Sequence, residues 1–143
     1  MIIEPGFEAL VETLIGDMEP NMATIMGLEF NKLTKEECIA TMPVHSATVQ
    51  PFRVLHGGAS VAMAETLASV GAWLHVPKDK TAVGLEINAN HHRPVKEGGQ
   101  VTGVAKPIQI GRTIQVWDIR IMDEKERLVC TSRCTIAVIN RPN

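Results

Sequence analysis

Cysteines, aromatic residues and clustered positive charge are all scarce in this chain of 143 residues. Its three cysteines, Cys38, Cys130 and Cys134, are an odd number without a Cys-x-x-Cys pair. They offer no disulfide framework and suit a reducing compartment, so we expect a cytoplasmic protein. Cys130 and Cys134 have no further ligand nearby, which predicts two small buried side chains and no metal site.

The composition also excludes several classes of partner. Three Phe, two Trp and no Tyr argue against a platform that stacks nucleic-acid bases. A net charge of −2 gives no basic stripe for nucleic acid and no polybasic patch for a membrane. Residues 1–25 lack the pattern of a signal peptide. The apolar stretch Leu55–Val76 is interrupted by Glu65 and two histidines, which favours a buried helix of a soluble protein over a membrane span.

The hydrophobic pattern predicts one α+β domain spanning residues 1–143. An amphipathic helix is expected within residues 1–20, because apolar residues recur at helical spacing there. Gly16, Pro20 and Asn21 would end it. The stripe consists of Phe7, Leu10, Val11, Leu14, Ile15 and Met18.

Strands are predicted on both sides of a long central helix. Gly27–Leu33 and Glu37–Val44 come before the helix, and four longer strands follow it. Those four are Ala82–His92, Gln100–Ile110, Thr113–Met122 and Arg127–Ile139. A tight polar turn between the last two predicts that the four are antiparallel neighbours in sequence order. A single sheet covers only one side of the apolar helix, so a partner subunit is expected on the other.

Glu65 is the only charged side chain in Val54–Val76. A carboxylate in such an apolar helix is costly to bury unless it has a partner, which indicates a functional group. Glu65 and Ser69 are four residues apart and share a helix face. His56 and Glu65 are nine apart, on opposite faces and about 13 Å apart along the axis. Two antiparallel copies of the helix would bring one chain's His56 to the other's Glu65, which predicts sites shared across a dimer.

Gly57 and Gly58 open this helix, and they suit an oxyanion site. Backbone N–H groups at a helix N-terminus lack partners, and glycine lets a ligand come close to them. Glu65 would then activate water or attack a carbonyl itself. Ser69 would hold the water, and Gln50 and His56 would orient the carbonyl. Glu65 alone favours function. The other residues are each better explained by structure when taken alone, and only their combined spacing indicates a site.

A cationic cluster is predicted where one of the later strands ends. His91, His92 and Arg93 are suited to binding phosphate, and Arg112, in the turn after the neighbouring strand, would join them. From residue type alone, a solvated strand end with ordinary charges is the better explanation.

Three blocks of sequence resemble the signature of hotdog-fold acyl-CoA thioesterases. The first is Gln50-Pro51-Phe52-Arg53-Val54-Leu55-His56-Gly57-Gly58-Ala59-Ser60 followed by Ala64-Glu65-Thr66. The others are Gly84–Val95 and Pro107–Arg112. The similarity runs from about Gly27 to Ile139. It is to one branch of the family, which contains the phenylacetate-pathway thioesterase, the 4-hydroxybenzoyl-CoA thioesterase of the Arthrobacter type, and the dihydroxynaphthoyl-CoA and enterobactin-proofreading thioesterases. Arg53 stands where close relatives often carry glycine, which would alter the loop over the acyl pocket.

The resemblance implies a hotdog fold, in which a curved antiparallel sheet wraps around the long helix, and dimers that commonly pair into tetramers. It implies hydrolysis of an aryl- or medium-chain acyl-CoA without a metal or redox cofactor. Glu65 would be nucleophile or general base, and the Gly57 N–H would polarise the thioester carbonyl. Gln50 and His56 would act from the neighbouring subunit, and Ser69 would position water.

A CoA channel is also implied by the resemblance. Its lining would come from the second and third blocks and the residues just after them. The expected residues are Gly84, Asn90, His91, His92, Arg93, Pro94, Gln109, Ile110, Gly111, Arg112, Thr113 and Ile114.

Three other functions remain open from the sequence. A hotdog hydratase or dehydratase would pair a histidine with a carboxylate, whereas Glu65 with Gly57 and Ser69 fits attack by water better. An acyl-CoA binder would need the same pocket without activated water. A purely structural dimer leaves Glu65 unexplained.

Overall fold

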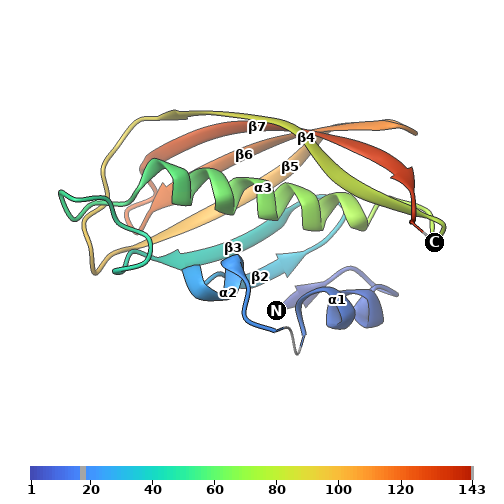
Figure 1. Ribbon diagram of the computed structural model, residues 1–143, viewed down its shortest axis with the longest axis horizontal. Coiled ribbons are helices and arrows are strands. Elements are labelled where there is room, and N and C mark those ends of the chain that lie inside the picture. Colours follow the sequence, from blue (N-terminus) through green and yellow to red (C-terminus); the bar gives the residue numbers. More distant parts are fainter. Residues whose placement is uncertain (17–18, 143) are drawn as a thin grey trace.

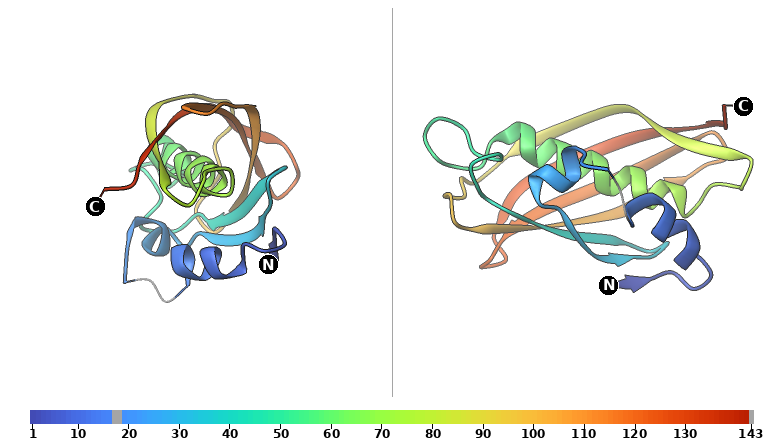
Figure 2. Two further views of the ribbon diagram at one scale, coloured as in Figure 1. Left: turned by 90° about the vertical axis from the view of Figure 1, so that its right-hand side faces the viewer. Right: turned by 60° about the horizontal axis from the view of Figure 1, so that its bottom comes forward.

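A seven-stranded sheet wraps around one long helix in the computed structural model, which describes residues 1–16 and 19–142. The helix, α3 (Gly57–Trp73), lies in the hollow of the curved sheet (Figures 1 and 2). The strands of the sheet are β1 (Ile2–Ile3), β2 (Glu29–Leu33), β3 (Cys38–Pro43), β4 (Lys80–His91), β5 (Gln100–Ile110), β6 (Ile114–Asp123) and β7 (Leu128–Asn140). The predicted α+β architecture and central helix are confirmed.

The strand order is β1-β2-β3-β5-β6-β7-β4. All pairs are antiparallel except β1 with β2. The prediction that the four later strands are sequential neighbours is therefore right for β5, β6 and β7 and wrong for β4, which pairs with β7. Residues 92–99 carry the chain from the end of β4 across the sheet to β5, so β4 becomes an edge strand.

The N-terminal region holds two short helices where one was predicted. α1 (Glu8–Ile15) ends at Gly16, and α2 (Met22–Met26) begins after Asn21. The Asn21 side chain accepts hydrogen bonds from two N–H groups of the first turn of α2, which is why this segment is helical. Gly27 ends α2 in the left-handed conformation, with φ of 74°, so β2 starts two residues later than expected. The predicted position of Met18 in the apolar stripe lies outside the described residues.

The core lies between α3 and the inner face of the sheet. Alternate residues of β3 point inward, so Cys38, Ala40 and Met42 are buried as their spacing predicted. Trp117 of β6 is fully buried, and a methyl group added at Gly71 would lie 2.6 Å from its ring. This close approach of helix and sheet fixes the height of α3 above the strands. Cys130 and Cys134 are also buried, as predicted.

One face of α3 is not covered by the sheet. Its buried residues include Met63, Leu67 and Ala68, whereas Glu65 on the opposite side is exposed. The expectation that Glu65 sits in an apolar interior is wrong for the single chain, because the carboxylate points away from the core. Among the described residues, no helix combines the length and hydropathy needed to span a membrane.

Candidate active site

The N-terminus of α3 is held by His56, the residue before its first turn. The His56 backbone is extended, and its Nδ1 accepts a hydrogen bond of 2.8 Å from the Gly58 N–H. The His56 N–H donates to Thr48 O. Across the described part of the chain, the Gly57 N–H has no hydrogen-bond acceptor. This end of the helix therefore offers a free backbone donor together with the positive end of the helix dipole.

A cavity of about 370 Å³, which we call the Gly57 hollow, opens at this helix end. Its polar lining includes Gln50, Gly57, His91, His92 and Arg93. A methyl group at Gly57 would lie 2.8 Å from His91 Nε2, so the absence of a side chain lets the imidazole lie against the helix backbone. The arrangement places a backbone donor beside cationic or polar side chains, which suits an anionic or carbonyl-bearing ligand.

The loop that carries Gln50 is fixed by its own contacts. Gln50 Oε1 accepts a hydrogen bond from the Phe52 N–H, and Arg53 adopts a φ of 60°. Arg53 Nε donates to Glu97 Oε2 at 2.9 Å, and Nη2 pairs with the other oxygen. Arg53 is thus bound to Glu97 in the turn before β5, and Phe52 is left 87% exposed at the tip of the loop.

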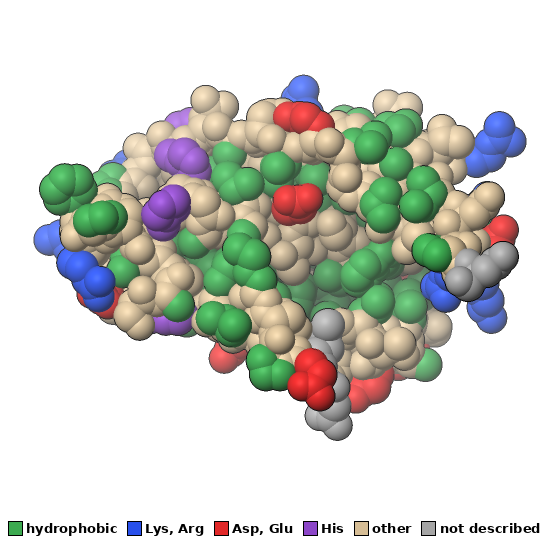
Figure 3. Space-filling model, in the orientation of Figure 1, with side chains coloured by type: hydrophobic (Ala, Val, Ile, Leu, Met, Phe, Trp, Pro, Cys, Tyr) green, Lys and Arg blue, Asp and Glu red, His purple; other side chains and the backbone are tan. Residues whose placement is uncertain are grey.

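A second cavity, the Glu65 hollow, follows the uncovered face of α3. It has a volume of about 450 Å³ and is lined by Gly58, Val61, Ala62, Glu65, Thr66, Ser69, Val70, Trp73 and, from α2, Met22. Glu65 and Ser69 lie on one face, as their spacing predicted. Figure 3 shows this side of the molecule, with hydrophobic side chains gathered over α3.

The two hollows are separate within one chain. Gly57 and Glu65 are eight residues apart in α3, which corresponds to about 12 Å along the axis. Glu65 lines only the second hollow, and Gln50 and Gly57 line only the first. The structure therefore does not bring the predicted carboxylate to the predicted oxyanion site in a single copy.

The cationic cluster is only partly as predicted. His91 is the last residue of β4, and His91, His92, Arg93 and Pro94 all line the Gly57 hollow. His92 Nε2 also lies 2.8 Å from Thr131 Oγ1. Asn90 belongs to the same end of β4, where it pairs with Thr131.

Arg112 does not join the cluster, which corrects the prediction. His91 pairs with Cys130, which pairs with Ile121, whereas Arg112 precedes Ile114 at the other end of β6. The seven-residue step from Ile114 to Ile121 spans about 23 Å of strand. The prediction treated β5, which Arg112 follows, as the neighbour of β4, but β6 and β7 lie between these two strands.

The remaining expected CoA-channel residues lie near that far end of the sheet. Gln109, Ile110, Gly111, Thr113 and Ile114 form the β5–β6 hairpin end. Gly84 lies in β4, where it pairs with Ile136 of β7. In one chain these residues and the His91 cluster are at opposite ends of the sheet.

The sequence did not single out several residues that line the two hollows, among them Ser60 and Met22. Ser60 is buried and lines the Gly57 hollow, and its position three residues after Gly57 on the same helix face was the available signal. Met22 lines the Glu65 hollow from α2, which was not predicted as a helix. No cluster of three or more potential metal ligands occurs within residues 1–16 and 19–142.

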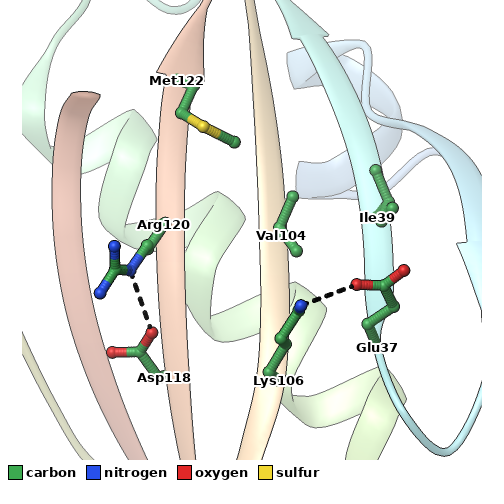
Figure 4. Close-up of a pocket in the computed structure, with 7 residues that line it drawn as sticks. All are labelled: Glu37, Ile39, Val104, Lys106, Asp118, Arg120 and Met122. Atoms are coloured by element: carbon green, nitrogen blue, oxygen red, sulfur yellow. Dashed lines mark ion pairs between the residues drawn. The ribbon is translucent and has the colours of Figure 1, made fainter. Parts of the chain in front are cut away.

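A further hollow on the outer face of the sheet is of a different kind. Figure 4 shows Lys106 of β5 directed toward Glu37, which precedes β3, and Arg120 toward Asp118, both on β6, with α3 behind them. The nitrogen–oxygen distances of these pairs are 3.3 and 3.5 Å. The charges on this outer face are engaged in ion pairs with one another, and none of them lines either hollow at α3.

Comparison with known proteins agrees with this architecture. The family model described as the thioesterase superfamily matches residues 52–130. The 1,4-dihydroxy-2-naphthoyl-CoA hydrolase of Escherichia coli is 47% identical over 129 residues, covering 90% of this chain and 94% of that protein. The proofreading thioesterase EntH of Cronobacter turicensis is 46% identical over 132 residues, covering 92% and 93%. A crystal structure of a Haemophilus influenzae thioesterase superposes with a TM-score of 0.82 at 47% identity, covering 91% and 88%.

The chain therefore belongs to the thioesterase superfamily. The resemblance seen in the sequence blocks is confirmed, and so is the hotdog fold. The chain is a thioester hydrolase.

Proposed function

We propose that the chain hydrolyses aryl- or medium-chain acyl-CoA thioesters to a free acid and CoA. The observation that carries the proposal is a lone carboxylate, Glu65, in a hollow on the uncovered face of the helix whose N-terminus offers the free Gly57 N–H. The names of the Escherichia coli and Cronobacter relatives, a naphthoyl-CoA hydrolase and a proofreading thioesterase, support the reaction class.

In the proposed reaction, the thioester carbonyl oxygen accepts a hydrogen bond from the Gly57 N–H, which stabilises the oxyanion as it forms. Glu65 either removes a proton from the attacking water or attacks the carbonyl itself, in which case water then hydrolyses the resulting mixed anhydride and restores the carboxylate. Ser69, one turn further along α3, positions the water. Gln50 and His56 orient the carbonyl, and the sulfur leaves as the CoA thiol. No step requires a metal or redox cofactor.

The proposed site is shared by two copies of the chain. Since about 12 Å of helix separates Gly57 from Glu65, a second copy must supply one of them. The edge strand β4 offers a twelve-residue ladder with exposed Val83 and Leu85, at 40% and 59%, which is suited to pairing with itself about a two-fold axis. Antiparallel pairing places the Gly57 end of one copy beside the Glu65 and Gly84 region of the other.

The same pairing resolves the position of Arg112. In one chain it lies at the Gly84 end of the sheet, far from His91. In an antiparallel β4 pair that end of one copy adjoins the His91 end of the other. Arg112 and the hairpin at Gln109–Ile114 then complete a cationic CoA channel with His91, His92 and Arg93 of the second copy. We include the pairing of such dimers into tetramers, and a cytoplasmic location suited to the free cysteines, in the proposal.

Engineered variants of a Staphylococcus aureus relative support the choice of residues. Two structures of that relative have been solved, each 34% identical to the chain described here. In one a glutamate is replaced by alanine, and in the other a glutamine is replaced by alanine. The two replaced positions are fifteen residues apart, which is also the spacing of Gln50 and Glu65. The same pair of residue types at the same spacing was thus selected for replacement there.

The test is a screen of CoA thioesters by free-thiol release, with the wild type and Glu65→Gln. We expect the variant to lose at least about 100-fold in kcat, as befits an acid–base or nucleophilic group. Glu124→Gln, which changes an exposed carboxylate in the turn between β6 and β7, is the matched control and should keep its activity. Near-wild-type turnover by Glu65→Gln on every substrate would refute the role of this residue.

Two alternatives give different results in the same assay. A hydratase or dehydratase would change enoyl-CoA absorbance without releasing thiol. A CoA-ester binder would bind tightly and release no thiol over hours. Either result would refute the proposed hydrolysis of acyl-CoA.

A further inference from the structure

We propose that, of the two acyl classes in the proposed function, the enzyme prefers the linear one, with a chain of about ten carbons or more that runs along α3 from Glu65 and ends in a groove under α1. This inference rests on the proposed function, because it assumes a thioester carbonyl at Glu65. The groove, called the α1 groove, has a volume of about 560 Å³. Its walls include Phe7, Leu10, Thr13, Leu14, Trp73 and Val76.

Trp73 connects the two spaces. It is the last residue of α3, and it lines both the Glu65 hollow and the α1 groove. Its indole Nε1 donates a hydrogen bond of 3.2 Å to Ala82 O, which holds the ring in place. On the side of the molecule shown in Figure 3, the surface is hollowed between α3 and the N-terminal helices. The wall shared by the two hollows is thus a fixed aromatic ring along which an alkyl chain can pack.

The lining changes along this path in a way that fits an alkyl chain. Close to Glu65 the helix presents Thr66, Ser69 and Val70, which are small enough to leave room beside the carboxylate. Beyond Trp73 the groove is mainly apolar, and none of the acidic residues within 1–16 and 19–142 lines it. Two cationic residues, Lys78 and Arg141, also line the groove. Arg141 already donates a hydrogen bond from Nε to Lys80 O. A hydrocarbon end would be removed from water there.

The length of the path sets the substrate class. Glu65 and Trp73 are eight residues apart, which is about 12 Å along the helix. An extended chain of C–C bonds of about 1.5 Å advances about 1.25 Å per carbon, so about ten carbons reach Trp73. A benzoyl or hexanoyl group would stay within the Glu65 hollow, whereas a dodecanoyl or tetradecanoyl group would enter the α1 groove.

The test compares kcat/KM for hexanoyl-, benzoyl-, dodecanoyl- and tetradecanoyl-CoA in two variants of α1. Thr13→Trp fills the groove from an exposed position, and Glu12→Trp places the same ring on the neighbouring residue, which does not line the groove. In the wild type we expect the two long chains to be the better substrates. Thr13→Trp should lower kcat/KM for them at least tenfold and leave hexanoyl- and benzoyl-CoA within twofold, and Glu12→Trp should change none of them. Equal effects of Thr13→Trp on all four substrates, or no preference for long chains in the wild type, would overturn the inference.

A binding measurement separates this inference from the proposed function. In Glu65→Gln, 12-bromododecanoyl-CoA should quench the fluorescence of Trp73, and Trp73→Phe should remove the quenching, because Trp117 is fully buried. If the wild type cleaves no thioester but the quenching is seen, the proposed function fails and the groove stands. If short acyl chains are cleaved and no quenching occurs, the inference about the α1 groove is refuted and the proposed function is kept. A loss of dimer in Thr13→Trp, seen by light scattering, would mean that a second copy covers the groove and would also overturn the inference.

Discussion

The carboxylate of Glu65 lies against the backbone of Gly84. A methyl group added at Gly84 would be 2.6 Å from Glu65 Oε1. Gly84 stands where the register between β4 and β7 shifts, so the strand is locally irregular beside the carboxylate. The contact fixes where the Glu65 side chain can lie on the otherwise open face of α3. Neither residue alone predicts this contact, because the helix and the edge strand meet only in the folded chain.

Replacing Gly84 with alanine should therefore impair activity with little loss of stability. The added methyl group meets only the end of a flexible side chain, which can move away at small cost, but the carboxylate then leaves its position. We expect kcat to fall at least about tenfold, because misplacing a reacting group by about 1 Å is that costly. The thermal midpoint should change by less than a few degrees.

A double-mutant cycle checks the mechanism of this effect. If Gly84→Ala acts only through the carboxylate, it should cause no further loss in a Glu65→Gln background. An additive loss in the double variant would show that Gly84 serves another purpose, such as contact with CoA.

Mixed dimers provide a direct test of the shared site. We expect Glu65→Gln and Gln50→Ala homodimers to be inactive when separate. After joint unfolding and refolding in equal amounts, a mixed dimer has one site with both defects and one intact site. Activity should return to about a quarter of the wild-type value, since half of the dimers are mixed and each has one working site. The readout is thiol release per subunit.

The control for this experiment is joint refolding of Glu65→Gln with Ser69→Ala. Both residues come from the same side of the proposed site, so neither mixed site would be free of a defect. Recovery of activity in the control would contradict sharing of the site between chains. A first mixture that forms mixed dimers but recovers no activity would contradict it as well.

His75 should make stability depend on pH. Burial lowers the pKa of the His75 imidazole below its ordinary value of 6.5, although its hydrogen-bonding contact with Lys35 O opposes the shift. The unfolded chain therefore takes up a proton at His75 before the folded chain does, as the pH falls below 6.5. The free energy of unfolding should drop through that range and level off below the folded pKa.

Urea unfolding of the wild type and His75→Gln between about pH 7.5 and about pH 5 measures this contribution. The wild type should lose more stability than the variant as the pH is lowered. The ring also packs edge-on against Trp117, with centroids 5.8 Å apart, so the variant should be less stable at the upper end of the range. Parallel pH profiles for the two proteins would show that His75 does not titrate differently on folding.

Much of the fold could be predicted from local patterns. The alternation of Cys38, Ala40 and Met42 predicted β3 and its buried face, and the Gly57-Gly58 pair after His56 predicted the start of α3. α2 was missed because its five residues are too few for a periodic apolar stripe, although Asn21 was the signal for its cap. The pairing of β4 with β7 was also missed, because the sequence of a strand does not indicate which strand distant in the chain it pairs with.

The sequence by itself determined which residues are chemically capable. It singled out Glu65 and Ser69 by helix periodicity, the Gly57 N–H by its place at a helix start, and His91, His92 and Arg93 by their charge, since these properties depend on spacings of a few residues. Only the tertiary structure decided where they stand. It put Glu65 on the exposed face of α3 against Gly84, and it put Arg112 at the far end of the sheet from His91. Those positions follow from strand order and from contacts between residues far apart in the chain, which no local pattern specifies.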